Sequence, residues 1–180
     1  MVTSTECFLE RHRFSGLRSS TFAAGSSFNE GELVPYVATC LFAGLRPGEV
    51  ERLDWPQVNL ADKEIRLEGQ QTKTGRPRVV TIHKTLAGWL KAYQGKPFFP
   101  SGWRKHFDAI KAIAGLNGWT PDILRHTAIS HFLRLTGSYG RTAEEFGNSE
   151  AIIKRHYQGR VSTEETKRFY SLKPSKNAQQ

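Results

Sequence analysis

The sequence predicts an α+β fold, a mostly helical domain that carries a small three-stranded antiparallel sheet. Apolar residues recur at helical spacing in segments on either side of the chain's middle. Between them, three short segments alternate apolar and polar residues, as strands with one wet face do: 57–60, 64–68 and 78–82. Helices that precede and follow a run of strands, rather than alternating with them, are typical of an α+β fold.

The size and charge of the chain indicate one domain with a polyanionic partner. Its 180 residues suffice for a hydrophobic core. A net charge of +9 and a pI near 9.8 favour nucleic acid as the partner, although a merely basic soluble protein fits them equally well. Cys7 and Cys40 stand alone, which is typical of reduced thiols in the cytoplasm. We expect a cytoplasmic protein with no membrane partner, because no apolar run is long enough for a bilayer and no signal segment is present.

The pattern of the chain divides it into three parts. Residues 1–28 are rich in Ser, Thr, Gly and Arg without periodicity, which predicts an N-terminal extension or the remnant of a linker. Residues 29–172 carry the periodic segments and form the predicted folded domain. Residues 173–180 are polar, and we expect a flexible tail.

The first predicted helix covers residues 29–43 and is apolar on wide faces, so it should lie in the core. Gly44 is suited to ending it, since glycine adopts the left-handed conformation of a helix C-terminus. Pro47 can begin a second helix, because the first helical position needs no N–H. Arg46 is therefore held at the junction of two helices. On its own, it fits a surface arginine in a helix–helix turn.

The link between the second and third strands is polar and basic, and Lys73 lies near its tip. Taken alone, Lys73 fits a solvated loop lysine. The remaining chain is helical in pattern, with turns at glycine. Helices are predicted over 84–93, 101–114, 120–133, 141–146, 149–157 and 162–171.

One arginine lies on the apolar side of the predicted helix 120–133. Ile129 and Phe132 form the apolar stripe, and Arg125 precedes them by four and seven residues. A guanidinium stays charged in proteins, so a buried one needs an anionic partner. Asp122 is placed for an ion pair at i,i+3. The alternative partner is a ligand anion.

Other residue types exclude several classes of site. The six histidines show no metal-ligand spacing, and neither a glycine-rich phosphate loop nor a Ser or Cys triad signature is present. We therefore expect no metal and no cofactor. Tyr157 lies four residues after Ile153, which by itself fits an amphipathic core tyrosine.

Four features in order change these interpretations. Residues 41–55 resemble the first arginine motif of the tyrosine recombinases, the phage integrase family. Residues 124–127 resemble the second arginine motif of that family, and residues 146–149 followed by Tyr157 resemble its nucleophile motif. Lys73, in a hairpin between two strands, matches the catalytic lysine of the family. The resemblance extends over about residues 29–171.

The resemblance implies a tyrosine-recombinase-like catalytic domain for site-specific recombination of duplex DNA, without a metal, a cofactor or a small-molecule substrate. By analogy, Tyr157 attacks the scissile phosphate and forms a 3′-phosphotyrosine. Arg46 and Arg125 hold the non-bridging oxygens, the role that fixed bidentate donors perform best. Lys73 protonates the leaving 5′-oxygen as a general acid. Self-association on DNA is also implied, with the predicted helix 162–171 docking on a neighbouring subunit.

Two candidate site residues depart from the pattern of the family. The family generally has His where this chain has Asp122, and His or Trp where it has Asn148. Asp122 could accept a proton or orient Arg125, but beside a phosphate it adds like-charge repulsion. His126 is interpreted as structural. Two alternative functions follow: a catalytically impaired DNA-binding module, and strand passage like that of a type IB topoisomerase.

Overall fold

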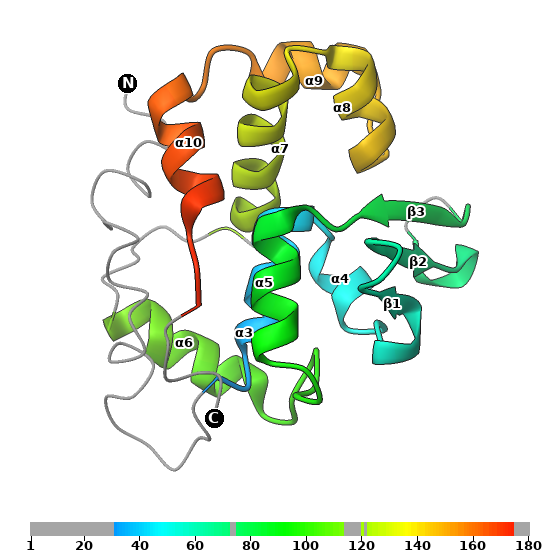
Figure 1. Ribbon diagram of the computed structural model, residues 1–180, viewed down its shortest axis with the longest axis vertical. Coiled ribbons are helices and arrows are strands. Elements are labelled where there is room, and N and C mark those ends of the chain that lie inside the picture. Colours follow the sequence, from blue (N-terminus) through cyan, green and yellow to red (C-terminus); the bar gives the residue numbers. More distant parts are fainter. Residues whose placement is uncertain (1–30, 73–74, 114–119, 121, 175–180) are drawn as a thin grey trace.

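The computed structural model describes residues 31–72, 75–113, 120 and 122–174. The predicted extension 1–28 and Lys73 lie outside the described residues, as does most of the predicted tail. The fold is mostly helical with one small sheet (Figure 1), which confirms the predicted fold class. The helices are α3 (Val34–Ala38), α4 (Pro47–Val50), α5 (Lys84–Ala92), α6 (Trp103–Ile113), α7 (Ile123–Thr136), α8 (Tyr139–Phe146), α9 (Glu150–Tyr157) and α10 (Thr163–Ser171).

The sheet has three antiparallel strands in the order β1 (Val58–Asn59), β2 (Glu64–Leu67) and β3 (Arg78–Thr81). Ile65 on β2 pairs with Val80 on β3, and both are fully buried. The alternation of apolar and polar residues therefore places one face on the core, as predicted. The first strand is shorter than expected, because Trp55–Gln57 forms a 3₁₀ turn (η3) that is capped by Asp54.

The first core helix changes geometry halfway. After α3, residues Thr39–Ala43 continue as a π-helical segment (η2), and every one of them is buried. Gly44 ends it with φ of 61°. A Cβ at Gly44 would lie 2.3 Å from the ring of Phe146, so glycine allows the end of η2 to approach the end of α8 closely.

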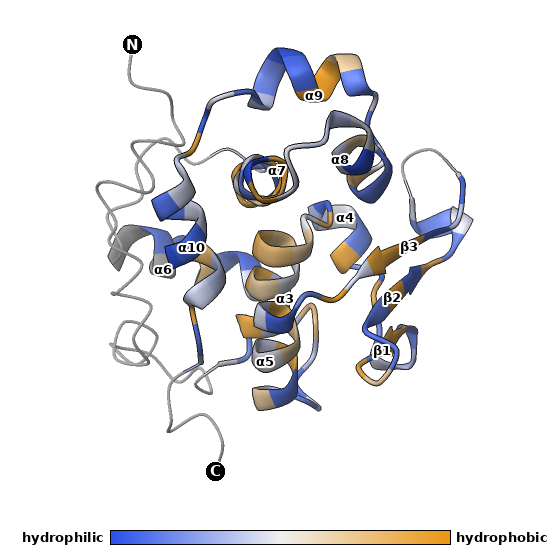
Figure 2. Ribbon diagram, turned by 45° about the horizontal axis from the view of Figure 1, so that its top comes forward, coloured by the Kyte–Doolittle hydropathy of each residue, from blue (hydrophilic) through white to orange (hydrophobic). Residues whose placement is uncertain are grey.

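Helix α7 lies at the centre of the helical half, between α10 and the α8–α9 pair (Figure 1). It packs on η2, α8, α9 and α10. One hydrophobic cluster joins its C-terminal half to Phe146, Ile153 and Tyr157, and a larger one gathers the earlier helices around the sheet. Figure 2 shows hydrophobic residues on the central α3 and hydrophilic ones along α8.

Helix α10 packs on α7 of its own chain, and its docking on a neighbouring subunit stays a prediction. Phe169 is buried at 3% exposure, and its ring stacks on His131 with centroids 4.1 Å apart. Nδ1 of His131 lies 3.1 Å from Oγ1 of Thr166, which is also buried. Phe169 and Thr166 of α10 are thus covered within the chain.

The start of α8 differs from the prediction for a local reason. Helix α8 begins at Tyr139, two residues before the predicted start, because the Ser138 side chain accepts a hydrogen bond from the Arg141 N–H at 3.2 Å and caps the helix there.

Within the described ranges, no helix combines the length and the hydropathy needed to cross a membrane.

Candidate active site

Arg125 joins three segments of the chain. Its side chain is buried in the first turn of α7, and the residue is 5% exposed. One guanidinium nitrogen donates to the carbonyl oxygen of Gly44 at 2.5 Å. The other donates to the carbonyl oxygen of Phe146 at 2.5 Å and to Oδ1 of Asn148 at 3.4 Å. One planar fork thus fixes the end of η2, the end of α8 and the approach to α9 relative to one another.

Neutral acceptors, not a carboxylate, hold this guanidinium. Asp122 is exposed, and no ion pair joins it to Arg125 in the described part of the chain. The intrahelical ion pair that the i,i+3 spacing suggested is therefore not formed. Burial and the nearby cations Arg46 and Arg78 together lower the pKa of Arg125 to about 10, against the attraction of Glu49. Arg125 is still cationic at neutral pH, in a region of positive potential.

Arg46 is held by a buried carboxylate. It is the N-cap residue of α4, and its backbone N–H donates to Oε2 of Glu49 at 2.8 Å. Its guanidinium forms an ion pair with Oε1 of Glu49 at 3.3 Å. The Arg46 side chain keeps 25% of its surface exposed, whereas that of Glu49 keeps 2%. The carboxylate thus anchors an arginine whose outer part faces solvent.

Arg78 is a third arginine of this region that the sequence did not indicate. It lies at the start of β3 and forms an ion pair with Oε2 of Glu49 at 2.8 Å. It also donates to the carbonyl oxygen of Glu145 in α8 at 3.0 Å. Arg78 therefore ties the β2–β3 hairpin to α4, which follows Arg46, and to α8, which precedes Asn148. The only signal in the sequence was its position directly after the basic hairpin that contains Lys73.

Tyr157 ends α9 and contacts a histidine of α7. The residue is 7% exposed, and its Oη lies 2.7 Å from Nδ1 of His126. The two rings stack at 27° with centroids 5.4 Å apart. Burial raises the pKa of Tyr157, which Arg125 opposes. The interpretation of His126 as merely structural missed this contact, because nothing in the local pattern connects residues on two different helices.

The remaining predicted residues lie around this centre at different depths. Asn148 is half-buried, and its side-chain oxygen faces Arg125. Asp122 precedes α7, and its backbone carbonyl accepts the N–H of His126 at 2.8 Å. The negative charge of Asp122 acts to raise the pKa of both His126 and Tyr157. Lys73 lies outside the described residues, but Thr72 beside it closes the hairpin by donating to the carbonyl oxygen of Arg76 at 2.8 Å.

The structure therefore brings together four of the six candidate residues. Arg125 binds Asn148 directly, and Arg46 and Arg125 lie near enough to Tyr157 for their charges to act to lower its pKa. Two cations, one amide and one phenol in one region are an arrangement suited to a phosphate and a hydroxyl nucleophile. In the described part of the chain, no group of His, Cys, Asp and Glu side chains could hold a metal ion.

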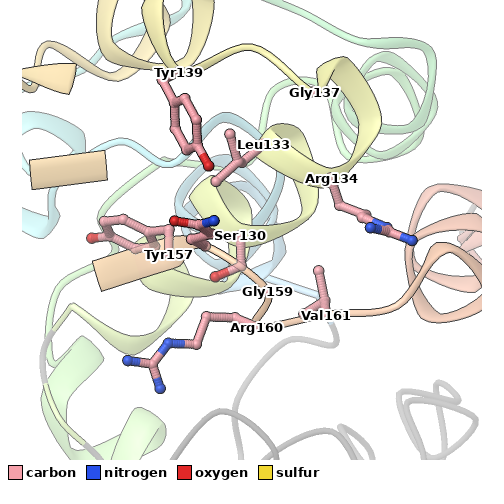
Figure 3. Close-up of a pocket in the computed structure, with 10 residues that line it drawn as sticks. Ser130, Leu133, Arg134, Gly137, Tyr139, Tyr157, Gly159, Arg160 and Val161 are labelled. Atoms are coloured by element: carbon pink, nitrogen blue, oxygen red, sulfur yellow. The ribbon is translucent and has the colours of Figure 1, made fainter. Parts of the chain in front are cut away.

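A separate pocket of about 180 Å³ lies behind Tyr157, between α7 and the chain that follows α9. Ser130, Tyr139 and Val161 contribute to its wall. Figure 3 shows the ring of Tyr157 at the edge of this pocket, with its hydroxyl directed away from Ser130 and Val161. The phenolic oxygen of Tyr157 therefore faces His126 rather than the pocket.

Comparison with known proteins agrees with this geometry. The model of the family described as "Phage integrase family" matches residues 33–147, more than half of the chain. In fold, the chain is similar to the structure titled "Crystal structure of XerA recombinase", with a TM-score of 0.54 and 18% sequence identity. That match covers 80% of this chain, which spans 63% of the XerA chain. No curated protein matches the sequence.

The resemblance that the two arginine motifs and the tyrosine motif indicated is thus confirmed at the level of the family. The matched residues include Arg46 and Arg125 and end at Gly147, next to Asn148. With its helical domain, its three-stranded sheet and a family match over most of that domain, this chain belongs to the phage integrase family, the tyrosine recombinases.

Proposed function

We propose that this domain is the catalytic domain of a site-specific recombinase, which breaks and rejoins strands of duplex DNA through a 3′-phosphotyrosine at Tyr157. The observation that carries this proposal is that Arg46 and Arg125 lie near enough to Tyr157 for their charges to act to lower the pKa of its hydroxyl. Two fixed cations beside a nucleophilic oxygen suit a phosphodiester, whose transition state spreads negative charge over its non-bridging oxygens. Membership of the family supports the same chemistry.

In this mechanism, each residue has a defined task. The oxygen of Tyr157 attacks phosphorus, and the bond from phosphorus to the 5′-oxygen breaks. Arg46 and Arg125 bind the non-bridging oxygens, and the Asn148 amide donates a further hydrogen bond. Lys73 gives a proton to the leaving 5′-oxygen. The energy of the phosphodiester is kept in the tyrosine linkage, and rejoining runs the same steps in reverse.

Duplex DNA is the proposed partner, bound chiefly through its phosphates. The net charge of +9 supports this, and binding should weaken steeply as salt rises. We also propose that copies of the protein associate on DNA, that residues 29–172 form the catalytic unit, and that the protein acts in the cytoplasm.

The proposal is tested with nicked suicide duplexes, because the nick lets the released strand diffuse away and traps the covalent complex. A pool with randomised sequence beside the nick avoids choosing a target site. Wild-type protein should form an adduct that survives denaturation, and Tyr157→Phe should form none. If wild type binds DNA in a salt-sensitive manner yet forms no adduct, recombinase activity is excluded.

That outcome would support the second candidate function, a catalytically impaired DNA-binding module. One specific observation favours this candidate. The carboxylate of Asp122 occupies a position where the family generally has His, and its charge acts to raise the pKa of Tyr157. A third outcome, relaxation of supercoils without preference for sequence, would indicate the type IB topoisomerase-like alternative.

A further inference from the structure

We propose that His126 is a catalytic residue that accepts the phenolic proton of Tyr157 during the attack on DNA. This deepens the proposed function and rests on it. The contact that carries the inference is already formed, since Nδ1 of His126 lies 2.7 Å from Oη of Tyr157. A candidate general base must lie within hydrogen-bond reach of the proton that it removes, and His126 does.

The position of His126 follows from the helix that carries Arg125. Successive residues on an α-helix point about 100° apart, so neighbouring side chains serve different surfaces. Arg125 reaches the carbonyl groups of Gly44 and Phe146, while His126 reaches across to α9. The N–H of His126 bonds the carbonyl of Asp122 at 2.8 Å, which fixes its place in the first turn. One helical turn thus supplies both a cation for the phosphate and a base for the nucleophile.

The charges around His126 favour the form that can accept a proton. Burial lowers the pKa of His126 below its ordinary value of 6.5, so the ring is neutral at pH 7. Arg125 and His156 act in the same direction, whereas Asp122 raises the pKa of the ring. In a neutral ring, Nδ1 accepts from the phenol when the ring proton is on Nε2. Asp122 would then stabilise the imidazolium that forms during the attack.

Tyr157 needs such a base. A free phenol has a pKa of about 10, so only about one molecule in a thousand is ionised at pH 7. Burial raises the pKa of Tyr157 and makes the phenolate scarcer still. Transfer along an existing hydrogen bond avoids a separate phenolate, because the proton leaves while the oxygen bonds to phosphorus.

The atoms and charges of the step balance. The oxygen of Tyr157 forms a bond to phosphorus, and its proton passes to Nδ1 of His126. The bond from phosphorus to the 5′-oxygen breaks, and that oxygen takes a proton from Lys73. In the rejoining step, the 5′-hydroxyl returns its proton to Lys73 and His126 returns its proton to Tyr157. His126 and Lys73 thus have opposite protonation states before each step.

Single-turnover cleavage of the nicked duplex across pH 5–9 tests the role. The wild-type rate should rise as pH increases through a pKa below 6.5, because only neutral His126 accepts a proton. His126→Ala should cleave about 100-fold more slowly, lose this acid limb and be partly rescued by added imidazole. His156→Gln is the matched control, since His156 lies beside Tyr157 on α9 with its ring centroid 6.5 Å away. It should keep the rate at neutral pH and the acid limb, with the midpoint of that limb shifted upward because His156 no longer lowers the pKa of His126.

A second measurement does not depend on turnover. Nitrogen-15 spectra of the wild-type protein at pH 7 should show His126 neutral with its proton on Nε2, and Tyr157→Phe should shift the Nδ1 signal. A proton on Nδ1 of the free protein would overturn the inference. An unchanged rate and acid limb in His126→Ala would also overturn the inference. In that case the proposed function would still stand, because wild type cleaves DNA. If wild type forms no adduct at all, the proposed function and the catalytic role of His126 both fail.

Discussion

Glu49 and Arg78 lie 29 residues apart in the sequence and form an ion pair of 2.8 Å, in which the Glu49 side chain is only 2% exposed. The same carboxylate binds Arg46 through both its guanidinium and its backbone N–H. A buried carboxylate with two cationic partners is well compensated. Glu49 therefore holds a predicted phosphate-binding arginine and the β2–β3 hairpin in one arrangement.

Glu49→Gln should destabilise the domain by about 3 kcal/mol, since it removes the anion from two arginines that are largely buried. Urea unfolding measures this. Glu51→Gln is the matched control, because Glu51 is exposed at the end of the same helix. The covalent adduct should also form more slowly in Glu49→Gln, since Arg46 loses its anchor. A stability equal to that of the control would show that the ion pairs contribute little.

Gly44→Ala should also destabilise the protein, by about 2 kcal/mol or more. Its φ of 61° disfavours any residue with a Cβ, and that Cβ would lie 2.3 Å from the Phe146 ring. Displacement of Phe146 would move one of the carbonyl groups that hold Arg125. Gly48→Ala provides the comparison, since it lies in α4 with open space around its Cα. Thermal unfolding should show Gly48→Ala as stable as wild type, and equal losses in both variants would refute the packing argument.

The fold was predictable because its signals are local. Periods of apolar residues, Gly44 and the alternation around Ile65 and Val80 each lie within a few residues of the element that they define. The same holds for the two arginine motifs, which lie within the residues that the family model matches. The architecture therefore followed from the sequence almost entirely.

The contacts within the site were not predictable in the same way. Tyr157 and His126 are 31 residues apart, and Arg78 lies 67 residues from the Glu145 carbonyl that it binds. Such pairs depend on how helices pack, and no local pattern encodes that packing. The i,i+3 spacing of Asp122 and Arg125 was misleading for the same reason, because closer acceptors from η2 and α8 satisfied the guanidinium.

His131 should make stability depend on pH. It is fully buried between α7 and α10, and burial lowers its pKa to about 4, although Glu165 opposes this. Thr166 donates its hydroxyl proton to the carbonyl oxygen of Ser162, so the Thr166 oxygen accepts from the N–H at Nδ1 of His131. Because its pKa is low, the His131 ring is neutral at pH 7. Within the described residues, Nε2 of His131 has no hydrogen-bond partner, so an N–H formed there by protonation would have no acceptor.

A histidine whose pKa is lower when folded favours unfolding once it is protonated. Stability should therefore fall as pH drops through 6.5 and continue to fall until about pH 4. Between pH 7 and pH 5, the contribution of His131 should be a loss of about 2 kcal/mol. Urea unfolding of wild type and His131→Gln at both pH values isolates it, because the other groups cancel in the difference. Equal losses in the two proteins would show that His131 does not titrate on unfolding.

Phe169→Ala should destabilise the monomer by about 3–4 kcal/mol rather than change its association. Phe169 is buried against His131 on α7 and Phe42 on η2, so its truncation leaves a cavity inside one chain. Lys167→Ala is the control, since Lys167 is exposed on the same helix. Urea unfolding gives the stability, and sedimentation of the free protein gives its association state. A dimer in wild type that dissociates in Phe169→Ala, with little loss of stability, would instead mean that α10 docks on a neighbouring subunit.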